Sequence, residues 1–80
     1  MNAPHTTAAA LAAALNAAGY RQGPPPWLSE LSRGIDREVC AEGACPACGH
    51  RGLTWQPWHH ARSRSYVALS LCSCGAAFEF

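Results

Sequence analysis

Two closely spaced pairs of cysteines in the second half of this 80-residue chain constrain its fold more than any other feature. The first pair lies in Cys45-Pro46-Ala47-Cys48-Gly49 and the second, after 23 intervening residues, in Cys72-Ser73-Cys74-Gly75. Four thiolates in two such pairs are the ligand set of tetrahedral structural zinc, with a hairpin between the pairs. The glycine after each pair permits the positive φ of a turn that aims backbone N–H groups at the sulfurs. The sequence therefore predicts one closed zinc site formed by Cys45, Cys48, Cys72 and Cys74.

Chain length and cysteine number both favour a metal over disulfides. A domain of this size buries little apolar surface and often needs a metal, a disulfide or a partner. Five cysteines cannot all pair within one chain. No Lys or Arg precedes Arg21, so the positively charged start of a secretory leader is missing. No apolar run approaches the roughly 20 residues of a membrane span. We therefore expect a cytoplasmic protein, in which cysteine pairs more often bind metal than form disulfides.

Helical signals occupy the first half of the chain. Residues 6–18 are alanine-rich, can be capped by Thr6 or Thr7 and end before Gly19, which predicts a helix. After the stiff Gly-Pro-Pro-Pro connector, apolar residues at three- and four-residue steps predict an amphipathic helix over residues 27–39. Its apolar positions are Trp27, Leu28, Leu31, Ile35 and Val39.

The second half carries short β-type segments. Strands are predicted over residues 52–58, 65–71 and 76–80, with residues 59–64 as the polar connection between the first two. Pro57 cannot donate a ladder hydrogen bond and indicates an edge or a strand end. We expect a small α+β fold in which two N-terminal helices precede a three-stranded antiparallel zinc ribbon. The expected divisions are an alanine-rich helix (1–23), a connector with the amphipathic helix (24–42) and the zinc ribbon (43–80).

The order and spacing of these residues resemble the zinc-ribbon family. In that family a Cys-Pro-x-Cys-Gly turn, a β-hairpin and a second cysteine turn are followed by a closing strand. The resemblance covers residues 45–80, and its second pair has one residue between the cysteines where the family usually has two. It implies a structural zinc ion and a role in docking nucleic acid or protein.

Other side chains in the chain are also able to bind metal. Cys40, five positions before Cys45, is a possible substitute ligand, although a small hydrophobe at a helix end is its more common role. His50, His59 and His60 are chemically competent as well. Because His50 directly follows the first turn and the other two fall in the predicted hairpin tip, we expect them to be solvated loop residues.

Three other chemistries use similar residues. A rubredoxin-like site would hold iron in four thiolates and carry electrons, although the spacing of the second pair fits it less well. A dithiol oxidoreductase could use Cys45 and Cys48, but such motifs normally begin a helix in a thioredoxin-like fold, of which there is no sign here. A hydrolytic zinc enzyme needs an open coordination position, which four cysteines would fill. We therefore expect neither an enzyme nor a small-molecule substrate.

Two kinds of partner are compatible with the sequence. The formal net charge of +1 excludes a globally basic nucleic-acid binder, so any such role must be local. Arginines and a ring around the predicted hairpin are the candidates for it: Arg51, Arg62, Arg64 and Trp58. Alternatively, the two N-terminal helices present apolar stripes to a protein partner or to a second copy of the chain.

Overall fold

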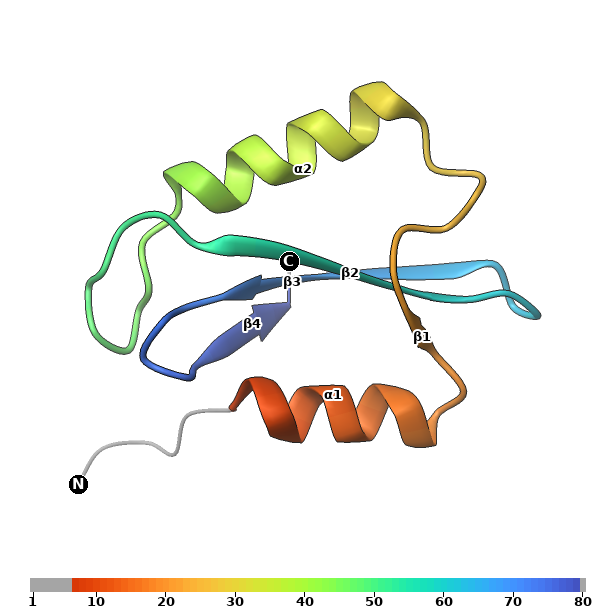
Figure 1. The fold of residues 1–80 in the computed structure, drawn as a ribbon, viewed down its shortest axis with the longest axis horizontal. Coiled ribbons are helices and arrows are strands. Elements are labelled where there is room, and N and C mark those ends of the chain that lie inside the picture. Colours follow the sequence, from red (N-terminus) through yellow and green to blue (C-terminus); the bar gives the residue numbers. More distant parts are fainter. Residues whose placement is uncertain (1–6, 80) are drawn as a thin grey trace.

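A computed structural model describes residues 7–79 of the chain as one antiparallel sheet between two helices (Figure 1). In chain order the elements are α1 (Ala8–Ala17), β1 (Arg21–Gln22), α2 (Glu30–Glu42), β2 (Thr54–His60), β3 (Ser65–Leu71) and β4 (Ala77–Glu79). The small α+β class is therefore confirmed. Thr6 and Phe80, the outermost residues of two predicted elements, lie outside the described residues.

The sheet has four strands in the order β1-β2-β3-β4, which corrects the prediction of three. The additional strand is β1, whose two residues pair with the end of β2 as Arg21↔His59 and Gln22↔Trp58. Both β1 residues are polar and exposed, so no alternation of apolar residues marks the strand in the sequence. The prediction failed because only the pairing with β2 makes this segment a strand.

The hairpin of β2 and β3 is the longest pairing in the molecule. It runs from Thr54↔Leu71 to His60↔Ser65, so β3 has its predicted bounds and β2 begins and ends two residues later than predicted. His59 and His60 consequently belong to β2, and the turn is confined to residues 61–64. Pro57 lies inside β2 and its carbonyl accepts from the Gly23 N–H at 2.8 Å, where the pairing with β1 ends.

Local capping decides where the two helices begin. The Thr7 side chain accepts from the Ala10 N–H at 3.1 Å and starts α1. The Ser29 side chain accepts from the Ser32 N–H at 3.1 Å, so α2 starts three residues later than predicted and reaches Glu42. Trp27 falls outside the helix because the prolines before it close a turn through the Leu28 N–H.

Side chains alternate between the two faces of the hairpin. Tyr66 and Ser70 face α2, since they contact Asp36 and Cys40 of that helix. Trp58 and Leu69 occupy the opposite set of positions, on the face away from α2, and are 3% and 1% exposed. No helix among the described residues is long and apolar enough to cross a membrane.

Candidate metal centre

Two hydrogen-bonded turns carry the paired cysteines. In the first, the Gly49 N–H donates to the Cys45 carbonyl at 2.7 Å. In the second, the Gly75 N–H donates to the Cys72 carbonyl at 3.0 Å. Gly49 and Gly75 have φ values of 78° and 95°, which confirms the left-handed conformation predicted for both positions. Each turn therefore adopts the shape that presents both of its cysteines on one side.

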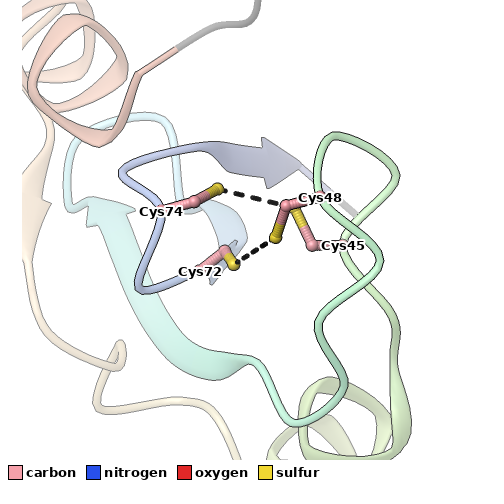
Figure 2. A group of neighbouring side chains, drawn as sticks. All are labelled: Cys45, Cys48, Cys72 and Cys74. Atoms are coloured by element: carbon pink, nitrogen blue, oxygen red, sulfur yellow. Dashed lines mark hydrogen bonds between the residues drawn. The ribbon is translucent and has the colours of Figure 1, made fainter.

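The sheet brings the two turns together. The first turn precedes β2 and the second connects β3 to β4, so pairing of these strands places both turns at the same end of the sheet (Figures 1 and 2). The sulfurs of Cys45, Cys48, Cys72 and Cys74 all lie within 4.8 Å of one another. The four predicted ligands thus form one cluster of thiols, and none of them is in a disulfide.

The distances between these sulfurs fit a single tetrahedral ion. The Sγ atoms of Cys48 and Cys72 are 3.6 Å apart, and those of Cys45 and Cys74 are 3.8 Å apart. Zn–S bonds of about 2.3 Å in a regular tetrahedron place sulfurs about 3.8 Å from one another. The one-residue spacing of the second pair therefore still allows both of its sulfurs to reach the cluster. The four cysteines could bind a metal ion, which is consistent with a zinc-ribbon-like module.

The four thiols differ in how readily they ionise. The backbone N–H of Cys74 favours the Cys72 thiolate and, with the neighbouring thiols, lowers the pKa of Cys72 to about 6. The backbone N–H of His50 favours the Cys48 thiolate, but the neighbouring thiols and burial outweigh it and raise the pKa of Cys48 to about 12. Neighbouring thiolates repel one another, so a bound cation would help to hold several of them in the ionised form.

Burial gives the cluster an inner and an outer side. Cys45 and Cys72 are buried and belong to a small core with Leu53 and Ala76, whereas Cys48 and Cys74 are exposed. An ion at this place would be anchored in the core and accessible to solvent from one side. The second turn also begins α1, because the Ala8 N–H donates to the Gly75 carbonyl at 2.9 Å.

Cys40 is not one of the four clustered sulfurs, although it shares a buried core with Cys45 and Cys72. It is 1% exposed near the end of α2, and its sulfur contacts the Ser70 hydroxyl at 3.2 Å. Burial is the main cause that raises the pKa of this thiol. Its surroundings are those of a small hydrophobic residue of the core.

The three candidate histidines also stay outside the cluster. His50 is exposed, while His59 and His60 are half-buried in β2. The His59 Nδ1 lies 3.0 Å from the Gly23 carbonyl and therefore donates to it. The His60 Nδ1 accepts from the Ser63 N–H at 3.1 Å. Both rings thus have structural hydrogen bonds rather than the solvated positions predicted.

The residues considered for nucleic-acid binding do not form one surface. Trp58 is buried, with its Nε1 donating to the Gln56 side chain at 3.0 Å, so a base has no access to its ring. Arg51 is exposed next to the first cysteine turn, at the opposite end of β2 from the hairpin tip. Arg62 and Arg64 are exposed at that tip, where the Arg64 guanidinium lies 4.6 Å from the centre of the Trp27 ring.

A network of polar side chains connects α2 to the sheet. The sequence pattern did not indicate this network. The Tyr66 hydroxyl donates to the Asp36 carboxylate at 2.5 Å and accepts from the Trp55 Nε1 at 3.1 Å. Burial, followed by the adjacent Asp36 carboxylate, raises the pKa of Tyr66. These residues are far apart in the sequence, and no local signal connects them.

Comparison of the chain with models of protein families, with curated proteins and with solved structures gave no match in any of the three. The resemblance to zinc ribbons therefore depends on the cysteine turns themselves and on the cluster that they form.

Proposed function

We propose that this chain is a small zinc-binding protein in which one structural zinc ion is held by Cys45, Cys48, Cys72 and Cys74. The observation that carries the proposal is the meeting of four sulfurs, from two separate turns, at distances that suit a single tetrahedral ion. Bound zinc would cross-link the two turns and supply part of the folding free energy. A reducing compartment such as the cytoplasm would keep the thiols available.

We propose a structural rather than a catalytic role for the ion. Four thiolates complete a tetrahedral coordination, so water or substrate would have no open position. The first turn borders a core that includes Leu53, and the second turn is bonded to the start of α1. An ion between these turns would stabilise both ends of the chain.

Metal analysis of the purified protein, with an absorption spectrum of the same sample, tests this proposal. We expect one zinc per chain and no visible colour. Chelation should then unfold the second half and also reduce the helical circular dichroism, because α1 begins on the Gly75 carbonyl. Iron with visible charge-transfer bands would support the rubredoxin-like electron carrier instead. A metal-free protein with unchanged dichroism would refute the structural role of a metal.

We further propose that the protein acts as an interaction module through α2. Three large apolar residues of this helix remain exposed, namely Leu31 at 75%, Ile35 at 51% and Val39 at 50%. They are three of the five apolar positions that the sequence pattern identified, and they face solvent. An unpartnered apolar stripe on a small protein is a common mark of a docking surface.

Nucleic-acid binding at the hairpin tip is a second candidate, favoured by the charge found there. Arg21, Arg62 and Arg64 are exposed near the tip and form no ion pair among residues 7–79. A labelled single-stranded oligonucleotide tests this role by fluorescence anisotropy. Phosphate binding should weaken steeply with salt and in Arg62→Gln/Arg64→Gln. Binding that ignores both changes, or no binding at low salt, would exclude it.

A further inference from the structure

The two faces of α2 have opposite surroundings. One face meets the sheet through Cys40, Asp36 and Arg37, which contact Ser70, Tyr66 and Trp55 respectively. The residues of the stripe, Leu31, Ile35 and Val39, recur every fourth position on the other face. Figure 1 shows α2 as an outer layer with no element on its far side. The apolar stripe therefore belongs to a face that the described part of the chain leaves uncovered.

Both arginines of α2 are directed away from this outer face. The Arg33 Nε donates to the Leu28 carbonyl at 3.1 Å and its Nη2 to the Pro25 carbonyl at 3.3 Å. The Arg37 guanidinium lies 5.3 Å from the centre of the Trp55 ring. Arg33 also pairs with the exposed Glu30 at 4.0 Å, and neither arginine forms an ion pair with Glu38 or Glu42.

The outer face consequently carries uncompensated acid. Glu38 and Glu42 are exposed and form no ion pair with any residue between 7 and 79. At about 100° per residue, both lie within about 60° of Ile35 around the helix axis. The stripe of Leu31, Ile35 and Val39 is thus bordered by negative charge along its C-terminal half.

A shallow, open groove adjoins this acidic border. Its volume is about 670 Å³, and it lies between α2 and the start of β2. Gly34 and Ala41 leave room on the helix side, and Leu53 and Trp55 supply apolar surface on the strand side. The charged side chains of Arg37 and Glu38 also line the groove. The groove can accept a large apolar side chain from a molecule that lies along α2.

We propose that α2 docks a basic amphipathic helix of another protein. This inference rests on the proposed role as an interaction module and names the chemistry of the partner. Apolar residues of the partner would cover the stripe, and its Lys or Arg side chains would approach Glu38 and Glu42. A second copy of the chain would cover the stripe less well. The outer face of its own α2 carries acids and no free cation, so it would repel Glu38 and Glu42.

Two synthetic helical peptides of about 14 residues, or roughly four turns, are the probes. They share the same leucine positions and differ only in carrying lysine or glutamate at the polar positions. Anisotropy of the labelled peptides is measured against the zinc-loaded full chain, after metal analysis of the same sample. We expect the lysine peptide to bind at least tenfold more tightly than the glutamate peptide.

Variants of the chain assign this binding to α2. Leu31→Ser/Ile35→Ser should abolish it, because the apolar contact is lost. Glu38→Gln/Glu42→Gln should weaken the lysine peptide by about three- to tenfold, as two surface charge pairs would be removed. Glu79→Gln, which removes an exposed acid on β4, is the matched control and should leave binding unchanged.

Several outcomes would overturn the inference. It fails if the two peptides bind equally, if neither binds the zinc-loaded chain, or if Glu79→Gln weakens binding as much as the α2 variant does. A dimer seen by size-exclusion light scattering and dissolved by Leu31→Ser/Ile35→Ser would identify a second copy as the occupant. Absence of zinc from the sample would instead be a failure of the proposed metal function, and it is detected before any peptide is added.

Discussion

The hydrogen bond between Tyr66 and Asp36 should be a main determinant of how firmly α2 is held. Tyr66→Phe removes the hydroxyl that donates to Asp36 and accepts from Trp55. A hydrogen bond to a charged group contributes about 1.5–3 kcal/mol, and partial exposure of both residues favours the lower end. Loss of the acceptor for Trp55 adds a smaller amount. We therefore expect the free energy of unfolding to fall by about 2 kcal/mol.

Chemical and thermal unfolding in excess zinc measure this loss. For a domain of this size, about 2 kcal/mol corresponds to a decrease in Tm of about 8–16 °C. A double-mutant cycle with Asp36→Asn isolates the pair and should give a coupling energy of about 1–1.5 kcal/mol. Tyr20→Phe is the matched control, since the Tyr20 hydroxyl has no side-chain hydrogen bond among the described residues. A loss below about 0.5 kcal/mol in Tyr66→Phe, or no coupling, would refute the reasoning.

The same tyrosine implies a dependence on alkaline pH. Burial and the Asp36 carboxylate raise the pKa of Tyr66 in the folded protein, so folding favours its neutral form. Its contribution to stability is therefore complete below the unfolded pKa of about 10 and is lost as the pH rises above that value. Tyr66→Phe should remove this alkaline loss of stability, and an unchanged alkaline profile would contradict the assignment.

Three further predictions concern the metal site and the core. Cys48→Ser should release the metal, whereas Cys40→Ala should retain one ion per chain, as measured by elemental analysis. Acidification from neutral pH should release the metal, because protons compete for the thiolates, and a colorimetric zinc indicator follows the release. Leu69→Ala should cost about 2–5 kcal/mol, since the side chain is buried, whereas Leu31→Ala should change stability by less than about 0.5 kcal/mol in urea unfolding.

Features decided by residues close together in the sequence were predictable. The cysteine pairs, the glycines that follow them and the bounds of β3 each depend on a few neighbouring residues, and the structure reproduces all of them. The site itself was predictable for the same reason. Each turn needs only its own glycine and hydrogen bonds, and the hairpin between the turns brings the four sulfurs together.

Features decided by pairing between distant segments were not predictable. β1 is a strand only because β2 offers it an edge, and Trp58 of β2 is 3% exposed only in the folded protein. The sequence of α2 determined an amphipathic helix by periodicity alone. Which face it turns to the sheet was decided by contacts of Cys40 and Asp36 with residues about 30 positions away. The periodicity of a helix indicates that one of its faces is apolar. Only tertiary contacts determine whether that apolar face is buried in the core or exposed to solvent.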